Sequence, residues 1–262
     1  MCIFVTMKKL ALILAAVLSV AATGLAQDRE IDLNSIELSK KGSRVETKLH
    51  IAFPMYFGWS VLTNVNYKGA WDNHLSFGDI QVPTTLNFLD MKTGQSFMYC
   101  LETAALHFSK PGGMLDFSIG MRCTFMDLSL QNTQYTFRNT MLGSGGNFYP
   151  TLIKNEALNY DGRKSKIHAN YIGVPVRLTF NFGKARVYVG GSAEVLVGGY
   201  TKYKFPKYRQ DATALFNRFR ATVEGGLQYG ILGFFVSYGL TPVFPNSLSD
   251  ARALTFGIVL GS

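Results

Sequence analysis

The sequence predicts an all-β fold, a closed antiparallel transmembrane β-barrel of eight strands, or ten if a long loop contains a hairpin. Three observations predict this class: large apolar residues alternate with small or polar ones, short connections alternate with long ones, and few residues are charged. Of the 262 residues, 16% are charged against a usual share of about 25%, and 47% are hydrophobic. This composition argues against an ordinary soluble enzyme and excludes a disordered chain. No run of about 20 apolar residues follows residue 26, which excludes a helical membrane protein.

The first 26 residues are typical of an export signal of the Sec type. Lys8 and Lys9 form its positive region, an apolar core follows, and Ala26 ends a small-x-small cleavage site. No cysteine comes directly after the apolar core, so we expect no lipid anchor. The predicted organisation is a signal peptide at 1–26, a short periplasmic lead-in at 27–43 and the barrel at 44–262.

Eight segments of the mature chain alternate with a period of two, which is typical of β-strands. In the first, Leu49 and Trp59 face one way while Lys48 and Ser60 face the other. Pro175 lies in the middle of another segment, where its missing N–H predicts a β-bulge. The predicted strands are residues 48–61, 96–108, 115–125, 171–182, 185–200, 218–229, 232–240 and 252–260.

The connections between these strands alternate in length. We expect short turns at residues 110–113, 183–184 and 230–231, and long segments at 63–94, 131–167, 201–217 and 242–250. This rhythm is typical of transmembrane barrels, which have short periplasmic turns and long extracellular loops.

One face of each predicted strand is apolar, and the other carries small residues with a few charges. In a soluble barrel of the lipocalin type the apolar face would point inward, leaving an outer surface poor in lysine and glutamate. In a membrane barrel the apolar face meets lipid, and the charges of both signs pair inside a narrow lumen filled by side chains. We favour the membrane barrel. The charged lumenal positions are Glu102, Asp116, Arg122, Arg177, Arg186, Glu194, Arg218, Arg220 and Glu224.

The hairpin formed by residues 96–126 tests this interpretation. If paired residue numbers sum to 224, Glu102 lies opposite Arg122 in the lumen. If they sum to 223, Cys100 lies opposite Cys123, but Glu102 points into hydrocarbon, which is costly. The first register is therefore expected, with the two cysteines on opposite faces and no disulfide between them.

The segment Tyr171-Ile-Gly-Val-Pro-Val-Arg-Leu178 resembles the Tyr-Leu-Glu-Ile-Pro-Leu-Leu-Leu pattern of the outer-membrane β-barrel proteins common in Bacteroidetes, a family that includes PorT-like proteins. The signal ending in Ala26 and the glycine-rich strand that follows Val187 are similar as well. Two features depart from the pattern of that family. Gly173 replaces the acidic residue that is usual there, and the sequence does not end in the aromatic residue that such barrels usually have. The resemblance implies an outer-membrane barrel, and PorT-like members are linked to protein secretion.

Catalytic, metal and cofactor sites are not indicated. The four histidines are scattered, and neither mature cysteine has a His or Cys partner at ligand spacing. Asp72, His74 and Asp79 in one loop and His168 at the rim are the only residues from which a hydrolase site could be built. We therefore expect no enzyme, no metal and no cofactor.

The third long loop interleaves basic and aromatic residues, a combination that suits a membrane interface because aromatic rings settle there and cations meet lipid phosphates. We expect contact with outer-membrane lipid or lipopolysaccharide there and no nucleic acid. The candidate residues are Lys202, Tyr203, Lys204, Lys207, Tyr208 and Arg209, and the second long loop adds the basic residues Arg163, Lys164 and Lys166.

The expected function is that of a non-enzymatic outer-membrane barrel, structural or accessory to envelope assembly or protein secretion, with surface loops for binding. A small pore or transport barrel is the first alternative, and a lipid-modifying outer-membrane enzyme is the second.

Overall fold

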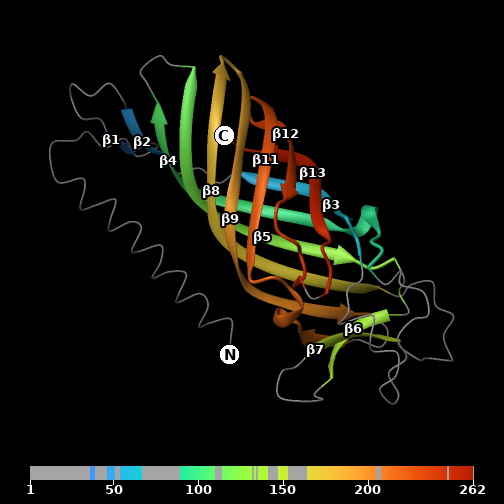
Figure 1. Cartoon of the computed structure of the whole chain (residues 1–262). Helices are drawn as coiled ribbons and strands as arrows, with labels where there is room; N and C mark the ends of the chain where they lie inside the picture. The colour runs from blue at the N-terminus through green and yellow to red at the C-terminus, as the bar shows by residue number, and fades with distance from the viewer. Residues whose placement is uncertain are drawn as a thin grey trace.

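Eight strands close into a barrel in the computed structural model of the chain (Figure 1). Around the wall the order is β4, β3, β13, β12, β11, β9, β8 and β5, and an antiparallel β4–β5 pairing completes the circle. This confirms the predicted fold class. The strands are β3 (Met55–Thr63), β4 (Phe97–Ser109), β5 (Leu115–Ser129), β8 (Ser165–Phe182), β9 (Ala185–Tyr203), β11 (Phe219–Tyr229), β12 (Leu232–Gly239) and β13 (Arg252–Leu260).

The structure describes residues 36–38, 46–50, 54–66, 89–109, 114–131, 133, 135–140, 147–152, 164–204, 208–246 and 248–261. The predicted signal peptide lies outside these residues. The remaining elements are β1 (Ile36–Leu38), β2 (Glu46–His50), β6 (Tyr135–Thr140), β7 (Asn147–Leu152), β10 (Tyr208–Asp211) and the 3-10 turns η1 (Thr93–Gln95) and η2 (Thr213–Leu215). No helix among the described residues is long and apolar enough to cross a membrane.

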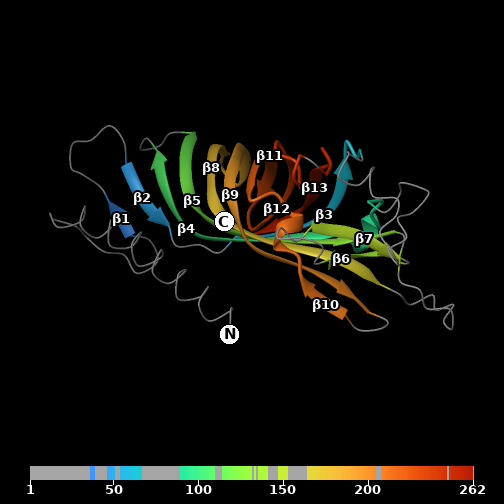
Figure 2. The same ribbon diagram turned by 60° about the horizontal axis from the view of Figure 1, so that its bottom comes forward.

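The second long connection contains a hairpin, as the sequence analysis allowed. Its strands β6 and β7 form a separate two-stranded sheet, so the barrel wall keeps eight strands. In Figure 2 this hairpin and β10 lie at the same end of the barrel. The two short turns that the structure describes lie at the opposite end (Figure 1), and the expected turn at 110–113 lies outside the described residues. Each of the two has two residues, beginning with Gly183 (φ 67°) or Gly230 (φ 59°), a left-handed conformation that glycine adopts without strain. We assign the short-turn end to the periplasm.

Three strands extend well beyond their predicted bounds. β5 continues to Ser129, β8 begins at Ser165 and β9 continues to Tyr203, the last two in segments where loops were expected. The buried positions at the start of β8 are Ser165, Ile167 and Ala169, and only one of these is large and apolar. The hydrophobic alternation of this segment was therefore too weak to predict a strand, although residues 165–170 pair with β9 in one unbroken register.

The first predicted strand is present as two pieces. β2 and β3 both pair with β4, but His50 lies opposite Ala105 whereas Met55 lies opposite Leu101, so the register changes by one residue between them. β1, within the predicted lead-in, pairs with β2 and adds a short strand there.

The β4–β5 register is the expected one. Glu102 lies opposite Arg122, and Cys100 lies opposite Thr124 rather than Cys123. Both cysteines are free, Cys100 buried and Cys123 half-buried on the other face.

The expected bulge at Pro175 is not found. β8 stays in register with β9 through the Pro175–Ser192 pair. Toward β5, bridges stop at Val176 and resume at Gly173 with no change of register, so the missing N–H is accommodated by a gap in that ladder. The register shift between β8 and β9 lies instead at Asn170 and Tyr171.

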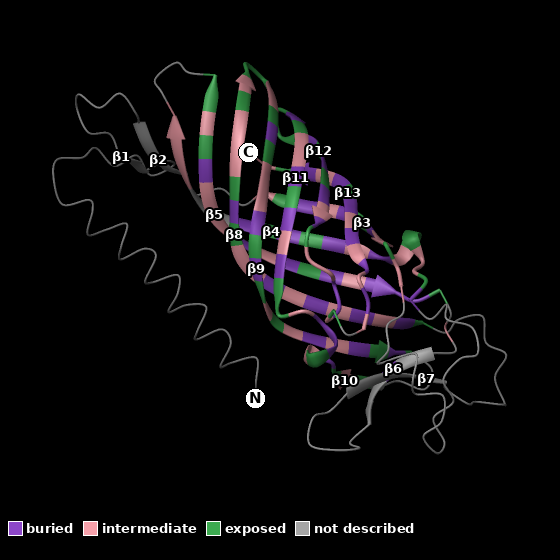
Figure 3. Cartoon of the chain, in the orientation of Figure 1, coloured by how far each residue is buried: buried purple, intermediate pink, exposed green. Residues whose placement is uncertain are grey.

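The outer face of the wall is apolar on all eight strands, and Figure 3 shows exposed and buried positions alternating along them. A soluble barrel would place this apolar band in water, whereas a membrane barrel places it against lipid, so the structure favours the membrane barrel. Exposed side chains on the band include Trp59, Tyr99, Phe117, Phe125, Val176, Val189, Val223, Phe234, Val236 and Phe256.

Replacing Val236 with arginine tests this orientation. Val236 is 52% exposed near the middle of β12, so Val236→Arg should lower the free energy of unfolding by about 2–4 kcal/mol because it places a charge in hydrocarbon. Val236→Leu is the control and should change it by less than about 0.5 kcal/mol. Denaturant titration of the barrel folded in lipid vesicles measures both. Equal stabilities of the two variants would show that this face does not meet lipid.

Candidate functional site

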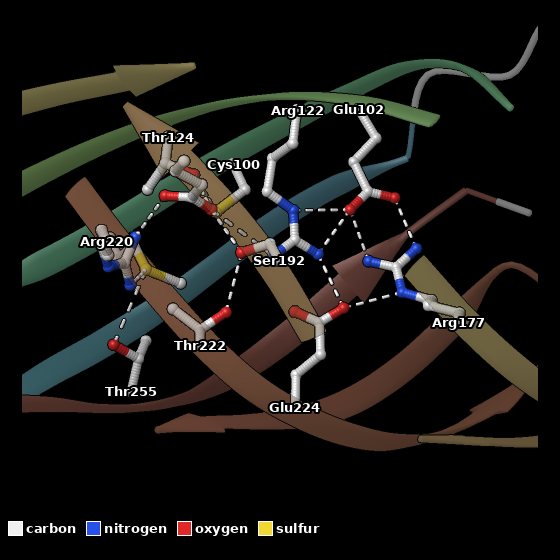
Figure 4. Close-up of polar contacts among 12 residues, drawn as sticks. Cys100, Glu102, Arg122, Thr124, Arg177, Ser192, Arg220, Thr222, Glu224 and Thr255 are labelled. Atoms are coloured by element: carbon white, nitrogen blue, oxygen red, sulfur yellow. Dashed lines mark hydrogen bonds and ion pairs between the residues drawn. The ribbon is translucent and has the colours of Figure 1, made fainter. Parts of the chain in front are cut away.

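The middle of the lumen holds a ring of two arginines and two glutamates (Figure 4). Arg122 Nε donates to Glu102 Oε1 at 2.7 Å, and Arg122 Nη2 donates to Glu224 Oε1 at 2.7 Å. Arg177 Nε donates to the same Glu224 oxygen at 2.8 Å, and the Arg177 guanidinium also donates to both oxygens of Glu102. Each charge therefore contacts two of the opposite sign, and four strands are joined across the lumen.

A second ion pair continues the network. Arg220 Nη1 donates to Glu194 Oε2 at 2.8 Å, and both residues are almost fully buried. The other carboxylate oxygen of Glu194 accepts hydrogen bonds from the hydroxyls of Ser192 at 2.7 Å and Thr124 at 3.2 Å. The ring and this pair together contain three arginines and three glutamates, so the network is neutral as a whole.

Tyrosine rings contact the arginines. The guanidinium carbon of Arg177 lies 5.0 Å from the ring centre of Tyr56 and 5.1 Å from that of Tyr188. Arg220 lies 5.6 Å from the ring of Tyr171. Cation–π contacts of this kind stabilise a guanidinium that water does not reach.

An apolar cluster fills the extracellular half of the lumen. Leu128 and Ile167 contribute from the wall, and each of the four long connections contributes at least one buried side chain. The side chains from the connections are Leu89, Phe137, Leu215, Phe216, Val243 and Phe244. This apolar cap was not predicted, because its members come from connections that lack strand alternation.

Gly173 makes room for the network. It lies opposite Glu194 on β9 and Arg122 on β5. A Cβ at this position would lie 2.2 Å from the Ala193 carbonyl oxygen and 2.6 Å from Glu194 Cγ, which neither atom can accommodate. The residue that departs from the family pattern is thus one that this lumen requires to be small.

Three predicted lumenal residues lie away from the network. Arg218 is exposed at the extracellular rim, one residue before β11, so its placement in the lumen was wrong. Arg218 lies two residues before Arg220, so alternation predicts the same inward face for both, but β11 begins only at Phe219. Arg186 is half-buried near the periplasmic turn, opposite Asn181 and Gln228. Asp116 contacts His107 Nδ1 at 2.6 Å near the same end.

Two of the candidate rim residues face outward and one faces inward in the described part of the chain. Lys202 and Arg209 are exposed on the outer face, Lys204 is exposed in the turn after β9, and Lys207 lies outside the described residues. Tyr203 is fully buried inside, so its assignment to a lipid contact was wrong. The reason is the alternation itself, since neighbours on a strand point to opposite faces. Tyr208 belongs to β10.

A bulge in β9 decides which rim residues face outward. Asn170 pairs with Gly198 and Tyr171 with Leu196, so Val197 is an extra residue. Below it Glu194 faces the lumen, and above it odd-numbered residues such as Tyr203 do. Without this bulge Lys202 would point inward.

Four further residues face outward beside Lys202 and Arg209, and of these only Lys166 was among the basic residues expected at this rim. Asp127 accepts a hydrogen bond from Lys166 Nζ at 3.0 Å and lies 3.6 Å from His168 Nε2. The His168 ring stacks on Tyr200 with centres 4.2 Å apart. The cross-strand register, which places Asp127 beside Lys166, 39 positions away, and His168 beside Tyr200, 32 positions away, is the signal that would have found them.

Metal-binding clusters of three or more His, Cys, Asp or Glu side chains are absent from the described part of the chain. The loop residues Asp72, His74 and Asp79 lie outside that part.

Removing one carboxylate from the ring tests its role. Glu224→Gln leaves Arg122 and Arg177 sharing Glu102, and should lower the free energy of unfolding by about 3–5 kcal/mol because a buried charge loses its partner. Removing a matched pair with Arg177→Leu/Glu224→Leu should cost less than the two single changes together.

The control for this measurement is Asp90→Asn, which changes an exposed carboxylate and should alter stability by less than about 0.5 kcal/mol. Urea titration of the folded barrel in vesicles gives the free energy of unfolding of the wild type and of every variant, including Arg177→Leu and Glu224→Leu alone. Full additivity of the Arg177 and Glu224 changes would contradict a coupled ring.

The sequence matches a known protein family. The family described as "Outer membrane protein beta-barrel domain" matches residues 56–245, well over half of the chain. Among solved structures the chain is similar to Ail, the attachment invasion locus protein of Yersinia pestis, with a TM-score of 0.31 and 10% identity, covering 81% of this chain and 99% of that one. No curated protein matches. The chain therefore belongs to the outer membrane protein beta-barrel domain family and is an outer-membrane β-barrel protein.

Proposed function

We propose that the protein is a non-conducting, non-enzymatic component of the outer membrane, structural or accessory to envelope assembly or protein secretion, with an extracellular surface used for binding. It would reach the membrane through the Sec signal peptide expected at residues 1–26. The observation that supports the proposal is the filled lumen, where a neutral network of six charged side chains lies beneath an apolar cap.

A pore is disfavoured for two reasons. The guanidiniums and carboxylates are already paired with each other, so a passing ion would have to displace ion pairs that are nearly dry. The apolar cap also places large apolar side chains such as Phe216 and Phe244 above the network, and such side chains cannot replace the hydration shell of an ion. The small pore or transport barrel remains the alternative function, and the conductance measurement below separates the two.

A lipid-modifying enzyme is the weaker alternative. Among the residues that the structure describes, His168 is the histidine at the extracellular end, and it contacts Asp127 and Tyr200 rather than a serine nucleophile. A triad needs a nucleophile within hydrogen-bond reach of its base. Retention of wild-type properties by His168→Gln would support the non-enzymatic proposal.

The proposed partners are lipopolysaccharide at the outer rim and, on the resemblance to PorT-like proteins of Bacteroidetes, a protein of secretion or envelope assembly. The protein-partner proposal is tested by in-cell crosslinking of a tagged copy and mass spectrometry of the purified complex. A stoichiometric secretion or assembly protein would support the accessory role, and a barrel recovered with lipid alone would support the structural one.

Single-channel recording tests the closed lumen. The wild-type barrel in planar bilayers should give no steady open conductance, because the network and the cap leave no continuous aqueous path. An open porin reconstituted in the same way is the positive control. A steady open conductance from the folded wild-type barrel would contradict the proposal.

A further inference from the structure

Three cations lie side by side on the outer wall at the extracellular end. Lys166 on β8 pairs in register with Lys202 on β9, and Lys202 pairs with Arg209 on β10. Their side chains share the outward face, at the inter-strand spacing of about 4.8 Å. We call Lys166, Lys202 and Arg209 the cation row.

The next row toward the membrane holds Asp127, His168 and Tyr200, opposite one another on β5, β8 and β9. Asp127 binds Lys166, and the guanidinium of Arg209 lies 3.9 Å from the ring centre of Tyr200, which also stacks on His168. Asp211, opposite Tyr200, accepts the Thr213 N–H at 3.0 Å. Aromatic and carboxylate contacts thus hold two of the three cations in place.

The cation row has too few carboxylates for its own charge. Like charges directly opposite on neighbouring strands destabilise a sheet. Among the described residues, one carboxylate forms an ion pair with the cation row: Asp127, which binds Lys166. Lys202 forms no ion pair with a described residue. A groove of about 520 Å³ lies beside the row and is lined by Lys164, Lys166, Lys202 and Lys204 together with Asp127, His168 and Tyr203. A group with two or more negative charges would neutralise this groove.

The position of the groove relative to the lipid band identifies the anion. Phe125, 47% exposed, lies on the same face of β5 two residues below Asp127. At about 3.3 Å per residue, the cation row stands about 13 Å beyond Phe125 along the wall. An anion in the groove is therefore beside the headgroups of the outer leaflet, and its attached acyl chains would lie on the apolar band below. A free anion or a soluble peptide would leave that band without a role in binding.

We propose that the cation row and the groove above Tyr200 bind a phosphate group of the lipid A part of lipopolysaccharide, with Lys166, Lys202 and Arg209 donating to the phosphate oxygens. The inference rests on the proposed function, since it names the partner of the extracellular surface. The lysines at the groove edge, Lys164 and Lys204, extend the positive surface toward the sugar side.

The experiment measures binding of purified, folded full-length barrel to diphosphoryl lipid A and to dephosphorylated lipid A by native mass spectrometry. The wild type should bind the phosphorylated form at least tenfold more tightly. Lys166→Gln/Lys202→Gln/Arg209→Gln should reduce that affinity about tenfold or more, because each charge near a lipid phosphate contributes to binding. Lys166→Arg/Lys202→Arg keeps the charges and should retain it.

The matched control is Lys92→Gln/Lys184→Gln/Arg218→Gln, which removes the same net charge from positions that do not share a row and should stay within twofold of the wild type. The heat-dependent gel shift of each variant reports whether it is folded. If the triple change prevents folding, Lys202→Gln alone takes its place, with a loss of at least twofold expected.

Three results would overturn the inference: equal affinity for the two lipid A forms, wild-type affinity in a folded row variant, or an equal loss in the matched control. A fourth is saturable binding of inorganic phosphate at the row with no preference between the lipids, which would mark a free-anion site. A conducting barrel would contradict the proposed function without changing any of these lipid measurements.

Discussion

Charge neutrality inside a narrow lumen is the constraint on which the rest of the structure depends. Three arginines and three glutamates from five strands lie in a space that little water reaches, where an unpaired ion costs several kcal/mol. A one-residue slip of any of these strands would turn its charge toward lipid. The network therefore fixes the register of the wall, and it joins residues as far apart in the chain as Arg122 and Glu224.

The apolar cap depends on the same geometry. Its wall residues, such as Leu128 and Ile167, continue the inward faces of strands whose register the charges determine. The four long connections each place a side chain against them, so the connections are attached to the top of the barrel at defined points. Charge below and apolar packing above together close the lumen.

Strand alternation predicted most of this fold but only part of the sites. The wall, the Glu102–Arg122 register and the central charges follow from residues whose faces differ strongly in polarity. The start of β8 does not show that contrast, and the bulge at Val197, which reverses the faces of upper β9, has no sequence mark. For this reason Tyr203 was assigned to a lipid contact, and Lys166 was expected in a loop rather than on a strand. Arg218 was wrongly predicted to lie in the lumen, because strand alternation predicts which face a residue lies on but not where along the barrel axis the strand begins.

The wall is of unequal height, with 18 and 19 residues in β8 and β9 but 8 and 9 in β12 and β13. The two tallest strands carry Lys166 and Lys202, so these cations are mounted on a hydrogen-bonded ladder rather than on a loop. Such mounting keeps the ordering cost of ligand binding low, because the backbone is already fixed. The extracellular loops can then change in length and sequence without moving these two groups, which separates the evolution of the loops from that of the wall.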